Sequence, residues 1–170
     1  MKEAILVDVD GTVAIMRDRS PFDYDMVGHD SINFPVWECI SSLERTKGYT
    51  IIFCSGRENV EFPGKSANGK YFRRAYLPTD GFDKEYPTCF DLTLAWLDYY
   101  CSIYNMGRYP TLYMREAGDN RPDYMVKKEL YNNLISKEFD VKLVFDDRQQ
   151  VVDMWRSIGL TCFQVAEGNF

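Results

Sequence analysis

The sequence lacks the patterns that mark membrane-bound and secreted proteins. No apolar run reaches the roughly 18 residues that a membrane span requires, and an apolar segment begins at residue 4 without the basic and apolar regions of a signal peptide. The five cysteines are scattered and include no C-x-x-C pair, so neither a zinc site nor a disulfide framework is predicted. These absences predict a protein of the reducing cytoplasm with no membrane partner.

Two further absences limit the function. No G-x-x-x-x-G-K-[ST] occurs, which argues against a phosphate-binding kinase loop of that type. The net charge of −6 argues against a general nucleic-acid coat protein, although it leaves room for a local basic patch. The single histidine, His29, lies in a polar stretch with no evident partner, and we assign it no role.

The order of predicted elements indicates the fold class. The 170 residues, of which 45% are hydrophobic, are most simply one domain over 1–170. Apolar strands are predicted at 4–7, 49–54, 110–115, 141–145 and 161–165, and helices at 34–47, 87–106, 123–137 and 149–158. This alternation predicts an α/β fold of three layers, Rossmann-like, with a parallel five-stranded central sheet covered on both faces.

Local signals set the predicted helix ends and core faces. Asn33 and Thr88 are the expected N-caps, and Gly48 is the expected stop of the first helix. Residues 14–33 are predicted to form an irregular polar loop. The helix at 87–106 carries an apolar stripe that is predicted to be core, formed by Leu92, Ala95, Trp96, Tyr99 and Ile103.

The stretch AILVDVDGT at residues 4–12 carries the strongest functional signal. Its apolar run predicts a buried parallel strand, so Asp8 and Asp10 should lie at the carboxyl end, where open α/β sheets bind ligands. Two neighbouring carboxylates repel each other unless a cation or a shared proton compensates. Mg²⁺ is the expected cation because it takes oxygen ligands from carboxylates and phosphate. The alternative is that Asp-Gly is only a common turn dipeptide here.

Other strand ends carry chemistry that fits this prediction. The second strand is followed by Ser55 and Arg57, and the fourth by Asp146 and Asp147. Because parallel strands end at the same edge of a sheet, these side chains should meet the carboxylates of the first strand in one crevice. Concentrated carboxylates destabilise a metal-free protein, but Mg²⁺ and a phosphate would balance them. Ser55 by itself could equally be a satisfied turn residue.

These positions resemble the haloacid dehalogenase superfamily of phosphotransferases. Residues 8–13, DVDGTV, match its first motif, DxDGT[LV], while Ser55, Lys127 and 146–147 match the second, third and fourth. The resemblance implies that Asp8 is the nucleophile that forms an aspartyl-phosphate. It implies that Asp10 protonates the leaving alkoxide and later activates water.

The same resemblance implies the metal and phosphate ligands. Asp146 would hold Mg²⁺ together with Asp8 and the backbone carbonyl of Asp10, and Asp147 would bind the ion directly or support its ligands. Ser55 and Lys127 would neutralise the phosphoryl oxygens. Thr12 and Gly56, which belong to the matched motifs, are expected at the substrate.

A closer resemblance links the chain to the 3′-phosphatase domain of phage-type polynucleotide kinase-phosphatase. It is carried by residues 141–170, by Arg19 with SPFD at 20–23, by SGRE at 55–58 and by D-x-R-x-D-x3-K at 119–127. The resemblance implies that Arg19 and Arg57 engage the substrate phosphate and that Asp123 orients Lys127 from one helical turn away. Asp123 could instead be a first-turn charge that favours the helix dipole.

Residues 58–87 are longer than the corresponding loop of that family. Between Phe62 and Phe82 they combine five aromatic residues with Lys65, Lys70, Arg73 and Arg74. Such a loop can follow a phosphate backbone and stack bases, but a solvated loop with anchoring aromatics is an equal alternative. The connections at 14–33 and 116–121 are too short for a lid domain, so a minimal cap and an open site are expected, which suits a polymer end.

The predicted function is therefore a Mg²⁺-dependent phosphatase that removes a terminal 3′-phosphate from DNA or RNA ends. A separate kinase or ligase is a possible partner in end repair, a homo-oligomer is possible, and a phage-encoded protein would work in the host cytoplasm. One alternative is a small-molecule nucleotidase of the same superfamily that acts on 3′-nucleotides. The other is a non-catalytic module that binds nucleic-acid ends, against which the complete set of matched residues argues.

Overall fold

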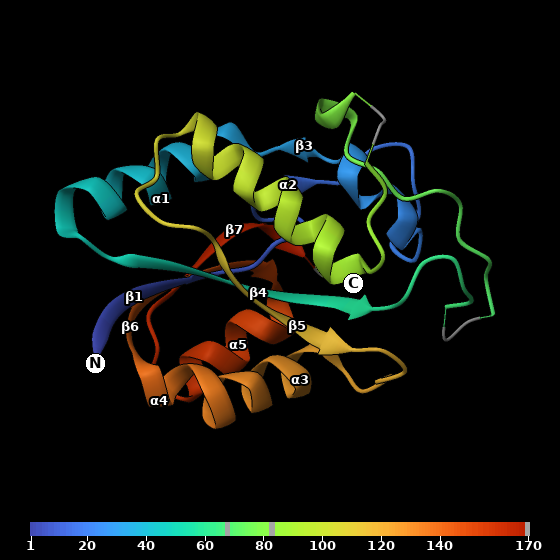
Figure 1. Cartoon of the computed structure of the whole chain (residues 1–170). Helices are drawn as coiled ribbons and strands as arrows, with labels where there is room; N and C mark the ends of the chain where they lie inside the picture. The colour runs from blue at the N-terminus through green and yellow to red at the C-terminus, as the bar shows by residue number, and fades with distance from the viewer. Residues whose placement is uncertain (67–68, 82–83, 169–170) are drawn as a thin grey trace.

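The centre of the molecule is a five-stranded parallel sheet (Figure 1). The computed structural model describes residues 1–66, 69–81 and 84–168. The strands lie in the order β5-β4-β1-β6-β7. Their bounds are β1 Lys2–Val7, β4 Thr50–Asn59, β5 Thr111–Glu116, β6 Phe139–Arg148 and β7 Cys162–Gly168. The apolar part of β1 is buried, as expected of a strand with neighbours on both sides.

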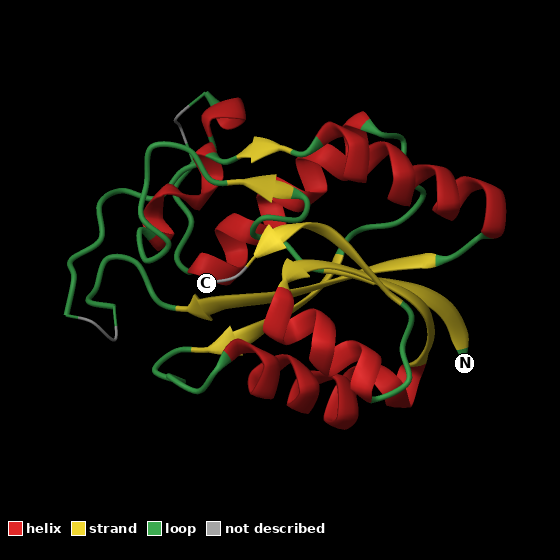
Figure 2. Cartoon of the chain, turned by 180° about the vertical axis from the view of Figure 1, so that it is seen from behind, coloured by secondary structure: helices red, strands yellow, loops and turns green. Residues whose placement is uncertain are grey.

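Helices cover both faces of this sheet and complete three layers (Figure 2). One face carries α1 (Phe34–Lys47) and α2 (Cys89–Ile103), and the other carries α3 (Asp123–Leu130), the π-helical segment η3 (Tyr131–Ile135), α4 (Ser136–Glu138) and α5 (Gln149–Ser157). Each face has its own apolar core, with Trp37 and Trp96 in one and Trp155 in the other. The predicted α/β fold with a parallel five-stranded sheet is confirmed.

The predicted helix ends match the sequence signals in part. The Thr88 hydroxyl accepts a hydrogen bond from the Asp91 amide at 3.0 Å, which is N-cap geometry. Gly48 ends α1 in the left-handed conformation. Asn33 occupies the N-cap position of α1, but its side chain makes no cap bond and donates to the Thr12 carbonyl at 2.9 Å. Asn33 therefore ties α1 to the turn that follows β1.

The core face of α2 is turned relative to the predicted stripe. Its first half is buried, but Tyr99 and Ile103 are 38% and 52% exposed. The buried side continues through Leu97 and Cys101 instead. Both stripes satisfy the helical period, and the packing against the sheet selects the side that contains Thr93, which is fully buried.

Two predicted elements have different bounds in the structure. The helix predicted over 123–137 is divided, because α3 ends at Leu130 and a π-helical turn follows before α4. A π-helical turn takes up extra residues and shifts the face that a helix buries, which places Ile135 in the core. The second strand continues past residue 54 to Asn59, with a shift in its pairing to β5 between Ser55 and Glu58.

The polar loop predicted at 14–33 is partly regular. β2 (Ala14–Ile15) pairs antiparallel with β3 (Ser31–Ile32), and the 3₁₀ helix η1 (Tyr24–His29) lies between them. The segment is ordered because some of its side chains are apolar and packed, such as Val27, which is fully buried. It covers the core at the carboxyl edge of the sheet.

The aromatic residues of 58–87 mainly anchor this loop, which contains the short 3₁₀ helix η2 (Pro78–Asp80). Phe62 and Phe72 are each 9% exposed, and their rings meet edge to face with centroids 5.0 Å apart. Tyr86 is also buried, and its hydroxyl donates to Asp80 at 2.6 Å. Phe82 lies outside the described residues.

The basic residues of the same loop are largely engaged within the protein. Arg73 lies 3.5 Å from Asp25, and Arg74 forms an ion pair with Glu85. Tyr71 is 73% exposed and has the Lys65 ammonium over its ring at 4.7 Å. Of the two interpretations of this loop, the contacts favour anchoring aromatics over a broad base-stacking surface.

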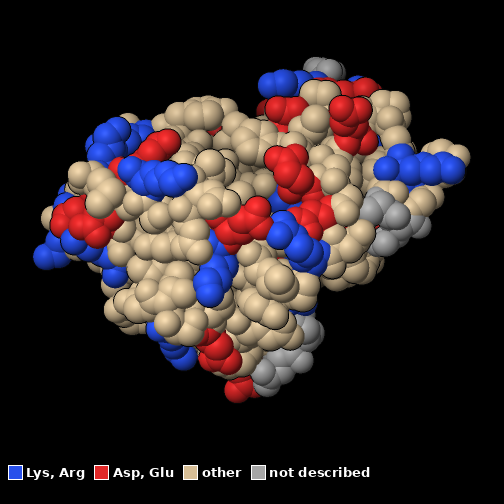
Figure 3. All heavy atoms as spheres, turned by 90° about the horizontal axis from the view of Figure 1, so that it is seen from below, with Lys and Arg blue, Asp and Glu red and all other residues tan. Residues whose placement is uncertain are grey.

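The surface agrees with the charge balance of the sequence. No helix in the described part of the chain combines the length and the apolar character that crossing a membrane requires. The face formed by α3 and α5 is seen from below in Figure 3, where basic and acidic side chains are mixed and separated by uncharged surface. This face does not present a continuous basic field.

Candidate active site

The turn after β1 fixes Asp8 at the carboxyl edge of the sheet. The Asp8 amide donates to the Phe145 carbonyl of β6 at 2.9 Å, and the Ala14 amide closes the turn on the Val9 carbonyl at 2.8 Å. The Thr12 hydroxyl donates to Asp8 Oδ2 at 3.1 Å. Thr12 is fully buried, so its placement favours orienting Asp8 over the predicted contact with substrate.

Two glycines allow the loops of the site to meet. Gly11 has a φ of +78°, and a Cβ there would lie 2.1 Å from Oδ2 of Asp147. At Gly56, a Cβ would lie 2.2 Å from Oδ1 of Asp123. Side chains at either position would displace a carboxylate of the site.

Three buried carboxylates form a group that can hold a metal ion. One oxygen each of Asp8, Asp146 and Asp147 lies within 4.8 Å of the others. Lys127 lies beside them with its side chain 1% exposed, and its Nζ is 2.6 Å from Asp8 Oδ1 and 3.0 Å from Asp146 Oδ2. One ammonium thus faces three carboxylates, which leaves an excess of negative charge.

Burial sets the pKa values of these groups first, and the neighbouring charges set them second. Burial raises the pKa of Asp8 well above its usual range, while Lys127 opposes the shift and Asp146 and Asp147 add to it. Burial and the neighbouring Asp146 raise the pKa of Asp147 to about 6. Burial would lower the pKa of Lys127, but Asp123, Asp146 and Asp8 raise it well above its usual value. A divalent cation with oxygen ligands suits this donor set because it would offset the repulsion.

Helix α3 presents Lys127 and its supporting anion. Asp123 lies one turn before Lys127, and their charged atoms are 3.5 Å apart. Asp123 also accepts from Arg115 Nη2 at 3.1 Å. Burial would raise the pKa of Asp123, but Lys127 and Arg115 hold it below the usual value. Asp123 is therefore an anion held beside Lys127, in addition to its place in the first turn of α3, and its role in orienting Lys127 stays a prediction.

A second cluster binds Asp10 with two arginines. Arg57 donates Nε to Asp10 Oδ2 at 2.7 Å and Nη2 to Oδ1 at 2.8 Å. Arg19 donates Nη2 to Asp10 Oδ1 at 3.1 Å. Burial would raise the pKa of Asp10, but Arg57 and then Arg19 lower it below the usual value. Asp10 is thus held as a carboxylate whose side chain is still 36% exposed to the cavity.

Asp30 holds these arginines from behind, and the sequence patterns did not predict it. Arg19 donates Nε and Nη2 to Asp30, at 2.7 and 2.6 Å, and Arg57 Nη2 donates to it at 2.8 Å. The Asp30 side chain is fully buried. Thr93 of α2 accepts from Arg57 Nη1 at 3.0 Å. Neither residue belongs to a local motif, and only the folding of 14–33 and α2 onto the sheet reveals them.

Asp10 and Ser55 have contacts that differ from the roles predicted for them. Asp10 is outside the carboxylate group that can hold a metal ion, because its side chain faces the arginines. The expected role of its backbone carbonyl stays a prediction. Ser55 is fully buried, and its hydroxyl accepts from the Arg57 amide at 3.2 Å. Trp155 of α5, not predicted, donates to Asp146 Oδ2 at 3.2 Å.

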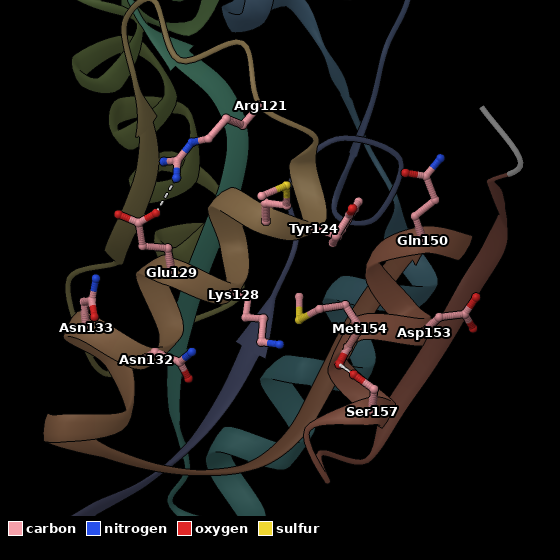
Figure 4. Close-up of a pocket in the computed structure, with 11 residues that line it drawn as sticks. Arg121, Tyr124, Lys128, Glu129, Asn132, Asn133, Gln150, Asp153, Met154 and Ser157 are labelled. Atoms are coloured by element: carbon pink, nitrogen blue, oxygen red, sulfur yellow. Dashed lines mark hydrogen bonds and ion pairs between the residues drawn. The ribbon is translucent and has the colours of Figure 1, made fainter.

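Both clusters open into one cavity of about 910 Å³. A second cavity of about 760 Å³ lies between α3, η3 and α5 and shares Arg121 with the first (Figure 4). Of its acidic residues, Glu129 pairs with Arg121 at 2.6 Å and Asp153 accepts from Gln149 at 2.8 Å. The reactive groups therefore belong to the first cavity.

A family model described as the polynucleotide kinase PNKP phosphatase domain, of the haloacid dehalogenase type, matches residues 2–76 and 78–170. The chain belongs to this family. The predicted resemblance is confirmed, and the clusters around Asp8 and Asp10 are the candidate active site of a phosphatase domain of the haloacid dehalogenase fold.

Individual relatives agree with this membership. A protein of Autographa californica nuclear polyhedrosis virus, named for a bifunctional polynucleotide kinase/RNA ligase, is 31% identical over 164 residues, which are 95% of this chain and 19% of that protein. A chain in the structure of a Pnkp1/Rnl/Hen1 RNA repair complex is 29% identical with a TM-score of 0.69, covering 99% of this chain and 44% of that one.

A second structure of a Pnkp1/Rnl/Hen1 complex gives the same TM-score of 0.69 at 28% identity, covering 100% of this chain and 48% of its match. The chain thus spans less than half of the solved relatives and about a fifth of the viral one. The matched segment is the one that the family model describes as the phosphatase domain.

Proposed function

We propose that this chain is a Mg²⁺-dependent polynucleotide 3′-phosphatase that removes the terminal 3′-phosphate from DNA or RNA ends. The observation that carries the proposal is the pair of clusters in one cavity: Asp8 with Lys127, Asp146 and Asp147 on one side, and Asp10 with two arginines on the other. Such a site combines a nucleophile, a proton carrier and cations for a phosphoryl group.

In this proposal Asp8 attacks phosphorus and forms an aspartyl-phosphate, while the alkoxide of the sugar leaves. Thr12 holds one oxygen of Asp8 and Lys127 faces the other, so the carboxylate is oriented before substrate binds. Asp10 donates a proton to the leaving oxygen and then takes one from the water that hydrolyses the intermediate. Formation of the aspartyl-phosphate on Asp8 and its hydrolysis, both assisted by Asp10, together release inorganic phosphate.

The arginines give Asp10 a substrate-dependent protonation state. In the free protein, Arg57 and Arg19 hold Asp10 as a carboxylate. A phosphate that shares these guanidinium groups brings negative charge close to Asp10 and raises its pKa. Asp10 would therefore be a better proton donor with substrate bound than without it.

Mg²⁺ fits the carboxylate group formed by Asp8, Asp146 and Asp147. The ion prefers oxygen ligands. Burial raises the pKa values of Asp8 and Asp147 and the neighbouring carboxylates add to both shifts, so a bound cation would favour the charged forms. When bound, Mg²⁺ would supply charge neutralisation for the phosphoryl oxygens. Lys127, whose ammonium contacts both Asp8 and Asp146, would neutralise part of the remaining charge.

The similarity to proteins of RNA repair complexes favours a nucleic-acid end over a small molecule as substrate. A ligase, or a separate kinase, fits as a partner of this phosphatase in end repair. A nucleotidase that acts on 3′-nucleotides uses the same chemistry and is the second candidate, because the cavity by itself does not require a polymer.

The test is phosphate release from a panel of 3′- and 5′-phosphorylated DNA and RNA ends and 3′-mononucleotides, with and without EDTA. We expect turnover of 3′-phosphorylated ends that EDTA abolishes and that Asp8→Asn eliminates without unfolding the protein. Turnover by Asp8→Asn at the native rate would contradict the assigned nucleophile. A strong preference for mononucleotides would favour the nucleotidase.

A further inference from the structure

One wall of the active-site cavity is apolar and exposed. Ile15, Met16 and Phe22 line the same cavity as Asp8 and Asp10, and they are 43%, 38% and 50% exposed. Exposed apolar groups cost free energy in water, and apolar side chains that line one cavity beside a few charged groups are the usual composition of a ligand site. The phosphate chemistry described above makes no use of them.

The turn that carries Phe22 is held in place. The Ser20 amide donates to Asp23 Oδ2 at 3.0 Å, and the Phe22 amide donates to the Ser20 hydroxyl at 3.3 Å. Asp23 also forms an ion pair with Lys70 of the loop at 58–87. The side chain of Phe22 thus faces the cavity from a bonded turn.

The same turn is linked to the catalytic centre through Arg19. Its Nη1 donates to the Ser20 carbonyl at 3.1 Å, while its Nη2 donates to Asp10 at 3.1 Å. One side chain therefore joins the group that would protonate the leaving oxygen to the turn that carries the exposed ring. A substrate with its phosphate at Asp8 has its alcohol portion on the Asp10 side of the cavity, next to this turn.

We propose that Phe22, with Met16 and Ile15, is the stacking surface for the base of the terminal nucleotide. The inference rests on the proposed 3′-phosphatase function and names the specificity determinant of that site. A planar base attached to the sugar bearing the phosphate suits a phenylalanine ring, because bases stack on aromatic side chains without sequence preference. The cavity of about 910 Å³ lies within the range of ligand sites that hold a small organic molecule of this kind.

The test compares two oligonucleotides of the sugar type that the protein turns over faster. One ends in a 3′-phosphorylated adenosine, and the other ends in a 3′-phosphorylated tetrahydrofuran abasic residue with the same phosphate and neighbouring sequence. We expect the wild-type protein to prefer the adenosine end by roughly tenfold in kcat/KM. Phe22→Ala should remove this preference, and Phe22→Trp should restore it.

The control is Tyr109→Ala, which removes an aromatic side chain that is 66% exposed and lines neither of the two cavities described above. It should leave the preference unchanged. Equal turnover of both ends by the wild-type protein, or an equal loss on both ends in Phe22→Ala, would overturn the stacking surface while the 3′-phosphatase stands. Hydrolysis of neither end would overturn both proposals.

Discussion

At the scale of single residues, the geometry of the site depends on glycines that leave room for a neighbouring carboxylate. Gly11 combines a positive φ with a direct approach to Asp147, whereas Gly48 has a similar φ of +72° and no atom within 4 Å of the place that a Cβ would take. Substitution of either glycine would strain the backbone to a similar degree, but only at Gly11 would the new side chain also meet a carboxylate. They form a matched pair for testing whether the position of Asp147 matters.

Gly11→Ala and Gly48→Ala should both lower stability by about 1–2 kcal/mol, because each forces a Cβ into the left-handed region. Only Gly11→Ala should also weaken Mg²⁺ binding and reduce turnover, since its Cβ displaces Asp147. Urea unfolding measures the first effect, and titration of activity with Mg²⁺ measures the second. Equal Mg²⁺ dependence in both variants would argue against a role for Asp147 near the ion.

At the scale of elements, α3, which packs in the same layer as α5, places a lysine side chain at the carboxyl edge of the sheet. It places Lys127 among three carboxylates, while the next residue, Lys128, lines the cavity between α3 and α5 (Figure 4). Adjacent lysines on one helix thus have different environments, because Lys127 is buried among carboxylates and Lys128 lies at the surface. This contrast permits a test within one helix.

Lys127→Met should reduce kcat/KM by at least about a hundredfold, because it removes a preorganised positive charge beside the phosphoryl group. It should also destabilise the metal-free protein, since Asp8 and Asp146 lose their shared cation. Lys128→Met should change neither quantity appreciably. Steady-state kinetics and thermal unfolding provide the measurements, and comparable losses in both variants would remove the special role of Lys127.

At the scale of the whole molecule, the buried carboxylate group of Asp8, Asp146 and Asp147 should make stability depend on pH. Asp147 has a folded-state pKa of about 6, above its usual value of 3.8, so between these values the folded protein binds a proton that the unfolded chain does not. The contribution of Asp147 to the stability of the metal-free protein is therefore fully present below pH 3.8 and is lost as the pH rises to about 6. The raised pKa of Asp8 acts in the same direction.

Saturating Mg²⁺ should raise the Tm more at pH 7.5 than at pH 5.5, because the cation replaces the proton at the carboxylate group. Asp147→Asn should raise the Tm of the metal-free protein at pH 7.5 and reduce the Mg²⁺ effect. Differential scanning fluorimetry with Mg²⁺ and EDTA at both pH values measures this. A Mg²⁺-induced shift that is independent of pH would contradict the assignment of the acidic group as the metal site.

The sequence was sufficient for the sheet and for the charged groups that follow its strands. Asp8 and Asp146 follow strands whose ends the apolar pattern marks, so their meeting follows from parallel topology. Lys127 lies within α3, and only the family resemblance placed it at this edge of the sheet. Asp30 was missed because its role depends on how 14–33 folds back, and no local pattern encodes that. The same holds for the π-helical turn at 131–135, where the packing overrides the helical period.

The order of strands also has a consequence for synthesis on the ribosome. β1 emerges before the other strands of the sheet, but Ala4 pairs with Thr50 on one side and with Val141 on the other. The residues of β1 therefore cannot complete their pairing until β6 has been synthesised, and Asp8 meets Asp146 no earlier than that. An unpaired apolar strand edge is a site of aggregation, so the order of synthesis exposes β1 to that hazard before the sheet is complete.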